Sequence, residues 1–208
     1  MKKKILIATT NPGKFEELKL FLQELPFEYV SLSDVGITLN VEETGHTFEE
    51  NAILKAQTYA KISGLPAIAD DGGFEIDALH GEPGVKSHRW ISGDSEDSDD
   101  ALIAYAIQRM KDIPMSERGA QLRLVLAFAL PEGNVATSEA SIRGVIAEVP
   151  STSRTPGFPY RALLYLPDIG KFYDHSVLTP EETNRVNHRK KAIMQLVPDI
   201  MRLLTSNP

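Results

Sequence analysis

The chain opens with Lys4-Ile5-Leu6-Ile7-Ala8-Thr9-Thr10-Asn11-Pro12-Gly13-Lys14, a short apolar run followed by turn residues. The apolar run predicts a buried strand over residues 4–10, and Asn-Pro-Gly is turn chemistry. A helical pattern then runs from Phe15 to Leu25 and ends at Pro26. A strand, a turn and a helix in this order favour an α/β fold.

The rest of the chain continues this alternation. Thr47 and Glu50 have capping-box spacing, so a helix is expected from Thr47 to the stop at Gly64. Strands are expected over residues 27–32, 66–69, 74–78, 122–130 and 135–147. Helices are expected over 102–111 and from Thr179 onward, with Pro198 breaking or kinking the last stretch. The pattern predicts the α/β class with a mixed β-sheet.

Composition limits the kind of protein. The 208 residues are 42% hydrophobic, which fits one globular domain over 1–208, and the absence of cysteine excludes disulfides and thiolate metal sites. The net charge of −7 argues against binding to nucleic acid polymers but allows a small anionic ligand. The apolar runs are too short for a signal peptide or a membrane span, so a cytoplasmic protein is expected.

The first candidate site is the segment from Thr9 to Lys14, between the first strand and helix. A helix start offers backbone N–H groups and a positive dipole end, Gly13 allows close approach, and Lys14 adds a charge. Together they could hold a triphosphate. The alternative is an ordinary Asn-Pro-Gly turn that caps a helix.

The second candidate is acidic and combines Glu42-Glu43-Thr44-Gly45 with Asp70-Asp71-Gly72-Gly73. The second segment is expected at a strand end, where open α/β sheets usually place their sites. Carboxylates from two such segments suit Mg²⁺ on phosphates, and an aspartate nearby could deprotonate a water. The alternative is a pair of polar turns.

Two further candidates lie toward the C-terminus. His188 and Arg189, in a basic run on or before the last helix, could bind phosphate or the carbonyl edge of a base, or could form a solvated helix face. Phe158, in the loop Thr155-Pro156-Gly157-Phe158-Pro159-Tyr160, could stack on a base or fold into the core. Lys55, on the Thr47 helix, could be an ordinary surface lysine.

Taken together, these segments resemble one family, the inosine/xanthosine triphosphate pyrophosphatases, also called the Ham1 family. The matching blocks follow one another along nearly the whole chain, and six blocks in order are far more specific than any one of them. They are Thr9-x-Asn11-x-x-Lys14-x-x-Glu17; Glu43-Thr44-Gly45-x-Thr47-Phe48-x-Glu50-Asn51-Ala52-x-x-Lys55-Ala56; Ala69-Asp70-Asp71-x-Gly73; Gly81-x-Pro83-Gly84-Val85 with Ser87-x-Arg89; Gly157-Phe158-x-Tyr160; and His188-Arg189.

The resemblance implies an elongated mixed sheet with flanking helices, two lobes around a central cleft, and a homodimer. It implies Mg²⁺-dependent hydrolysis of ITP, dITP and XTP to the monophosphate and pyrophosphate. Thr9, Thr10, Asn11, Pro12, Gly13 and Lys14 would hold the phosphates with the help of Lys55. Glu43 and Asp71 would carry Mg²⁺, and Asp71 would also be the general base. Phe158 would stack on the base, and His188 with Arg189 would contact its keto edge.

The chain departs from the family pattern in the base-recognition block. Pro159, Arg161 and Ala162 replace a Gly, an Asp and a Pro around Tyr160, Thr183 stands near a position where the family commonly has Lys, and Gly72 replaces a Ser. Phosphate chemistry is therefore expected to persist, and an altered choice of base stays open. Two alternatives stay open: a pyrophosphatase for a different nucleoside triphosphate, and a nucleotide-binding protein without turnover.

Overall fold

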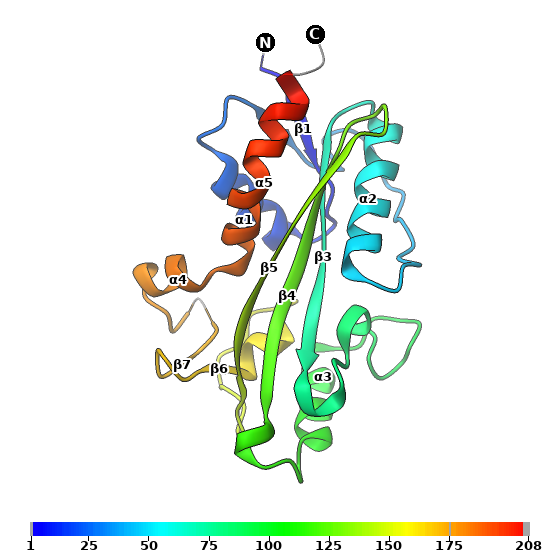
Figure 1. The fold of residues 1–208 in the computed structure, drawn as a ribbon. Helices are drawn as coiled ribbons and strands as arrows, with labels where there is room; N and C mark the ends of the chain where they lie inside the picture. The colour runs from blue at the N-terminus through cyan, green and yellow to red at the C-terminus, as the bar shows by residue number, and fades with distance from the viewer. Residues whose placement is uncertain (1, 175, 206–208) are drawn as a thin grey trace. The chain divides into compact units, whose positions relative to one another are not determined.

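The computed structural model describes residues 2–174 and 176–205. Its helices are α1 (Pro12–Leu22), α2 (Phe48–Ser63), α3 (Asp99–Arg109), α4 (Pro180–Val186) and α5 (His188–Thr205). Its strands are β1 (Lys4–Ile7), β2 (Glu28–Val30), β3 (Ala67–Ile76), β4 (Gly119–Ala129), β5 (Val135–Ile146), β6 (Leu164–Leu166) and β7 (Lys171–Phe172). Figure 1 shows their arrangement.

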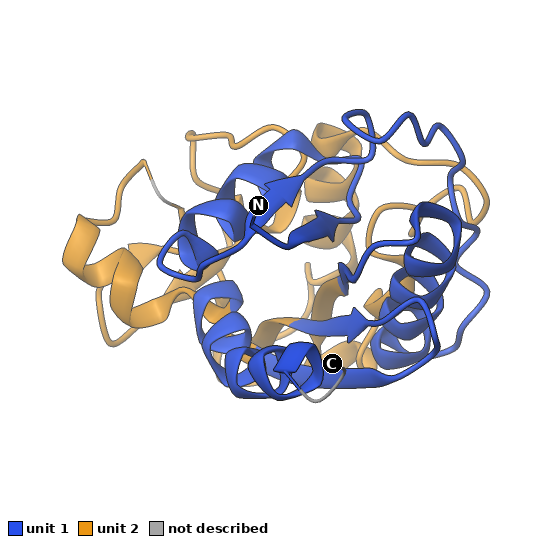
Figure 2. Cartoon of the chain, turned by 90° about the horizontal axis from the view of Figure 1, so that it is seen from above, with its two compact units in different colours: residues 1–71, 124–140, 189–208 blue, residues 72–123, 141–188 orange. Residues whose placement is uncertain are grey.

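The strands form one mixed sheet in the order β2-β1-β3-β4-β5-β6-β7. β1 pairs in parallel with both β2 and β3, whereas β6 pairs antiparallel with β5 and β7. The predicted α/β class with a mixed sheet is therefore confirmed. Residues group into two compact units, shown in Figure 2: unit 1 comprises 1–71, 124–140 and 189–208, and unit 2 comprises 72–123 and 141–188. The single domain predicted over residues 1–208 stays a prediction.

Unit 1 is built around its own apolar core. α1 and α5 lie on one side of its strands and α2 lies on the other, as Figures 1 and 2 show. The core between β1, α1, β4 and α5 contains fully buried side chains such as Ile5, Leu18, Phe128 and Leu196. Burial of each such side chain stabilises the fold by roughly 1.5–3 kcal/mol.

Unit 2 has a separate core, formed by side chains of β3, α3, β4, β5 and the segment 160–178. Phe74 and Tyr160 stack within it, with ring centroids 4.6 Å apart. A short 3₁₀ turn over Pro159–Ala162 brings Tyr160 into this core, and the Tyr160 hydroxyl donates to the Ser87 carbonyl at 2.6 Å.

Several boundaries differ from the sequence predictions. The first strand ends at Ile7 rather than at residue 10, and the helix expected from Thr179 onward is divided into α4 and α5. α1 begins at Pro12 rather than near Phe15, because Asn11 caps the helix and Pro12 occupies its first turn. The two strands predicted over 66–69 and 74–78 form one strand, β3. α5 runs through Pro198, so the predicted break does not occur, and the alternative of a kink at this residue stays a prediction.

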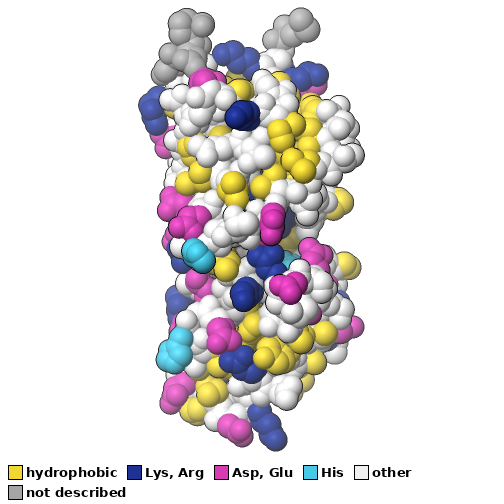
Figure 3. Space-filling view, turned by 90° about the vertical axis from the view of Figure 1, so that its right-hand side faces the viewer, with side chains coloured by type: hydrophobic (Ala, Val, Ile, Leu, Met, Phe, Trp, Pro, Cys, Tyr) yellow, Lys and Arg dark blue, Asp and Glu magenta, His cyan; other side chains and the backbone are white. Residues whose placement is uncertain are grey.

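No helix within residues 2–174 and 176–205 has the length and apolar character needed to cross a bilayer. On the face shown in Figure 3, acidic and basic side chains are interspersed rather than gathered into single-sign areas.

Candidate active site

The start of α1 is organised by Asn11. Its side-chain oxygen accepts hydrogen bonds from the backbone N–H groups of Gly13, at 2.9 Å, and Lys14, at 3.2 Å. The Thr9 hydroxyl in turn accepts from the Asn11 N–H at 3.2 Å. Two of the N–H groups that the sequence offered to an anion are therefore already capped, and the ammonium of Lys14 is the full positive charge at this position.

Lys14 belongs to a buried charge network on the α1 and α5 side of β3. Its ammonium nitrogen lies 3.1 Å from an Asp70 carboxylate oxygen, and the Arg189 guanidinium lies 2.6 Å from the same oxygen. Arg189 also donates to Glu17 at 2.9 Å. Burial raises the pKa of Asp70, but the charges of Lys14, Arg189 and Lys55 outweigh it and hold that pKa well below its ordinary value.

A second cluster lies around Asp71. The Lys55 ammonium is 2.5 Å from a Glu43 oxygen and 3.6 Å from Asp71 Oδ1, while Asn51 donates to Asp71 Oδ2 at 3.0 Å. Burial raises the pKa of Asp71 to about 6, Glu43 adds to that increase, and Lys55 and the Asn51 hydrogen bond oppose it. The pKa of Lys55 is raised, because Asp71 and Glu43 more than offset the lowering by burial.

Strand geometry explains why neighbouring aspartates join different clusters. Successive side chains of a strand point to opposite faces, so Asp70 and Asp71 on β3 meet different helices. The predicted strand end at Asp71 is wrong, because β3 continues through Gly72 and Gly73. A Cβ at Gly73 would lie 2.2 Å from the Ser87 hydroxyl, so close packing requires glycine there.

The donor set around Asp71 fits a divalent cation. Two carboxylates from different segments approach one ammonium, which marks a position where positive charge is stabilised. Mg²⁺ is typically held by one or two carboxylates, with water and substrate phosphates completing its shell. The described residues contain no group of three or more acidic, histidine or cysteine side chains arranged for a metal. Water would therefore complete the shell of this cation in the free protein, and substrate phosphates would join it when bound.

The predicted base-recognition residues of unit 2 form a cluster of their own. The Arg161 guanidinium lies over the Phe158 ring at 4.0 Å from its centroid and 5.8 Å from that of Tyr173. His188 Nδ1 is hydrogen-bonded to the Tyr173 hydroxyl at 2.9 Å. Arg161 and His188 are both buried, whereas Phe158 is half-buried. This cluster combines an aromatic ring with polar side chains, a combination that could recognise a planar, polar ring.

Other predicted residues lie elsewhere. Tyr160 and Pro159 are buried, and Tyr160 is a core residue of unit 2. Thr183 lies in the middle of α4, and its carbonyl accepts from the Asn187 N–H at 2.9 Å. Arg189 lies in unit 1 and contacts Asp70 and Glu17 there.

Sequence reasoning gave no separate role to Asp70, Glu17, Asn51 or Tyr173. The spacing of Asn51 could have indicated its place in the site, because it stands four residues before Lys55 and both side chains therefore share one face of α2. No local feature of the sequence indicates the role of Tyr173, because its contact with His188 depends on tertiary structure.

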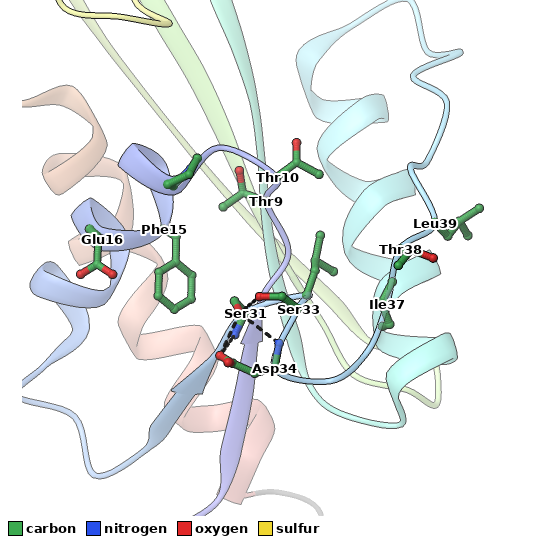
Figure 4. A pocket seen from close by; sticks show the side chains of 12 residues that line it. Thr9, Thr10, Phe15, Glu16, Ser31, Ser33, Asp34, Ile37, Thr38 and Leu39 are labelled. Atoms are coloured by element: carbon green, nitrogen blue, oxygen red, sulfur yellow. Dashed lines mark hydrogen bonds between the residues drawn. The ribbon is translucent and has the colours of Figure 1, made fainter.

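A cavity of about 500 Å³ adjoins the start of α1. Thr9, Thr10 and Phe15 line it together with the segment after β2, as Figure 4 shows. Within that segment the Asp34 carboxylate accepts hydrogen bonds from both the N–H and the hydroxyl of Ser31, each at 2.8 Å. These hydrogen bonds fix the conformation of this part of the cavity wall.

Known proteins resemble this chain over almost its full length. A dITP/XTP pyrophosphatase of Bacillus subtilis is 40% identical over 93% of this chain and 95% of its own. A dITP/XTP pyrophosphatase of Thermus thermophilus is 42% identical over 93% and 90%. The structure of the Staphylococcus aureus Ham1 protein superposes with a TM-score of 0.80 at 32% identity, covering 96% of this chain and 98% of that one. The Ham1 family profile matches residues 5–199, and the chain belongs to the Ham1 family.

Proposed function

We propose that this protein hydrolyses the deaminated purine nucleoside triphosphates dITP, XTP and ITP to the monophosphate and pyrophosphate. Relatives that share about 40% of its residues bear the name dITP/XTP pyrophosphatase. The observation that carries the proposal is the approach of Glu43 and Asp71 to the same Lys55 ammonium. This cluster supplies acidic and basic side chains that can take part in the hydrolysis of a phosphoric anhydride bond.

The charged groups of unit 1 have complementary parts in this reaction. Lys14 and Lys55 would neutralise phosphate charge, and the hydroxyls of Thr9 and Thr10 would donate to phosphate oxygens. Asn11, Pro12 and Gly13 would shape the segment that holds them. Mg²⁺ held by Glu43 and Asp71 would supply Lewis-acid stabilisation of the negative charge on the phosphates.

Asp71 is the residue we assign as general base. A water oxygen attacks the α-phosphorus, the bond between that phosphorus and the bridging oxygen breaks, and the water proton passes to the Asp71 carboxylate. Pyrophosphate leaves with the electron pair of the broken bond. The Asn51 amide and the Lys55 ammonium contact the two oxygens of this carboxylate and would hold it in place for the proton transfer.

The cluster of unit 2 would select the base. Phe158 would stack on the base, and His188 and Arg161 would donate hydrogen bonds to its keto oxygens. A keto base offers an acceptor where adenine offers an amino donor, so such a cluster would favour hypoxanthine and xanthine. The closeness of Arg161 to Phe158 also supports a second candidate, a preference for a different keto-bearing base.

A panel of triphosphates tests the proposal. The protein is incubated with ITP, dITP, XTP, dGTP, dUTP and ATP with and without Mg²⁺, and phosphate is measured before and after adding inorganic pyrophosphatase. Phosphate that appears only after the added enzyme identifies pyrophosphate as the product. Asp71→Asn should abolish turnover while nucleotide binding persists. Binding without turnover in the wild type would instead identify a nucleotide-binding protein.

The family resemblance also supports a homodimer. The net charge of −7 and the short apolar runs support action on free nucleotides in the cytoplasm rather than on nucleic acid polymers or membranes. Light scattering of the purified protein would test the dimer, and competition by single-stranded DNA in the hydrolysis assay would test the preference for free nucleotides.

A further inference from the structure

Asn51 is a fully buried amide on α2, one helical turn before Lys55. A buried side-chain amide requires hydrogen-bond partners, and those partners show what the residue holds in place. Asn51 has one partner in each of the two segments that carry the acidic pair.

The first partner lies in the segment of Glu43. The Asn51 side-chain oxygen accepts from the backbone N–H of Gly45, two residues after Glu43, at 2.7 Å. A Cβ at Gly45 would lie 2.7 Å from both that oxygen and the Glu50 Cβ, so only glycine allows this approach. The segment before α2 is thereby fixed against the start of the helix.

The second partner is the carboxylate of Asp71. Asn51 donates to Asp71 Oδ2 at 3.0 Å, and Lys55 lies 3.6 Å from Oδ1. One side chain of α2 therefore contacts each oxygen of this carboxylate, which restricts its rotation. The single amide of Asn51 links the Glu43 segment and the Asp71 carboxylate.

We propose that Asn51 is a positioning residue that sets the geometry of Glu43 and Asp71 as a pair of divalent-cation ligands. This inference rests on the proposed function, because the cation is part of that function. Residues that hydrogen-bond to metal ligands without contacting the metal typically contribute 10–100-fold to metal affinity or activity. Asn51→Leu keeps the branched shape at Cγ and removes both hydrogen bonds, so it should cost about that factor.

The chain offers a second variant and a matched control. Gly45→Ala disturbs the same link from the opposite side, because its Cβ meets Asn51. Tyr59→Phe is the control: Tyr59 also lies on α2, and its hydroxyl donates to the Leu39 carbonyl at 3.1 Å and accepts from the Val41 N–H at 3.3 Å. The Tyr59 hydroxyl thus connects α2 to the segment that precedes this helix, as Asn51 does, but it makes no hydrogen bond with Asp71.

The experiment measures cation binding apart from catalysis. Mn²⁺ is titrated into the nucleotide-free protein and free Mn²⁺ is read by electron paramagnetic resonance. Separate assays give the Mg²⁺ concentration for half-maximal pyrophosphate release, kcat and KM for dITP, and the melting temperature. We expect Asn51→Leu and Gly45→Ala to weaken Mn²⁺ binding by about 10-fold or more and to lower kcat with little change in KM. Their double variant should be no worse than the more severe single variant, and Tyr59→Phe should alter only the melting temperature.

Mn²⁺ affinity within twofold of wild type in both variants would overturn the proposal, as would an equal loss in Tyr59→Phe. If Asn51→Leu does not fold, Gly45→Ala and Asn51→Ser decide the question by the same criteria. Failure of the wild type to hydrolyse any triphosphate would refute the proposed function, whereas the Mn²⁺ titration would still decide the role of Asn51.

Discussion

Replacing Asp70 by asparagine should destabilise the protein substantially. The Asp70 side chain is 3% exposed and compensates Arg189, which is 8% exposed, and Lys14, which is 21% exposed. Removing one partner of a buried ion pair typically costs 3–5 kcal/mol. We expect the lower end, about 3 kcal/mol, because the asparagine oxygen can still accept from Arg189 and Lys14 can turn toward solvent.

Urea unfolding at pH 7, followed by circular dichroism, measures this cost. With a denaturant dependence of about 1–3 kcal/mol per molar urea, the midpoint of Asp70→Asn should fall by about 1 M or more. Glu28→Gln is the matched control, because the Lys4–Glu28 pair also lies in unit 1 but both side chains are about half exposed. Exposed pairs contribute about 0–1 kcal/mol. A loss in Asp70→Asn no larger than that in Glu28→Gln would refute the reasoning.

Three further outcomes follow from individual contacts. Thr47→Ala removes the side-chain cap of α2 and should lower the free energy of unfolding by about 1 kcal/mol in the same urea assay. Arg161→Asp places a carboxylate, which accepts hydrogen bonds, beside Phe158. Because guanine has an amino donor where xanthine has a keto oxygen, turnover of dGTP relative to XTP should rise by about tenfold in the triphosphate panel. Asp174→Asn should destabilise the protein at pH 7, and the difference from the wild type should shrink as the pH is lowered. Burial raises the pKa of Asp174, but the hydrogen bonds from Ser176 and Ser153 have the larger effect, so the pKa lies below its ordinary value. A lowered pKa stabilises the fold above the ordinary aspartate pKa of about 3.9, and this contribution is lost as the pH falls below it.

Each of these expectations can fail on a specific result. Unchanged stability of Thr47→Ala would show that Glu50, which accepts from the His46 N–H at 2.6 Å, fixes the helix start alone. If Arg161→Asp leaves the order of substrate preference unchanged, Arg161 does not take part in base recognition. A stability difference between wild type and Asp174→Asn that stays constant from pH 7 to about pH 3 would contradict the assigned pKa shift.

The sequence predicts α2 well because its signals are local. Thr47 and Glu50 form the capping box, and Gly64 ends the helix in a left-handed conformation with φ of 68°. The start of α1 was missed because Asn-Pro-Gly serves equally as a free turn and as the first turn of a helix capped by Asn11. Local signals therefore locate an element best when they have a single structural meaning.

Sequence reasoning brings the Glu43 and Asp71 segments together, but it does not separate the partners of Asp70 from those of Asp71. Glu43, Lys55 and Asp71 form one cluster in the structure, but the partners of Asp70 and Asp71 depend on a continuous β3 that sends their side chains to opposite faces. Gly72 and Gly73 read locally as a turn, whereas the hydrogen bond from the Phe74 N–H to the Ser87 hydroxyl and the packing at Gly73 depend on tertiary structure. Arg189 follows His188 directly, yet its ion-pair partners come from the first 71 residues.

The order in which the chain is synthesised has a consequence for unit 1. This unit takes residues from both ends of the chain, and its last segment supplies the buried side chains of Ile193, Leu196 and Ile200 together with the guanidinium that pairs with Asp70. Folding during translation generally proceeds from the N-terminus. Until α5 has been synthesised, a nascent chain therefore exposes the apolar side chains that α5 covers and lacks the Arg189 partner of Asp70. A premature stop within α5 would release such a chain to cellular proteases rather than yield a partly active enzyme.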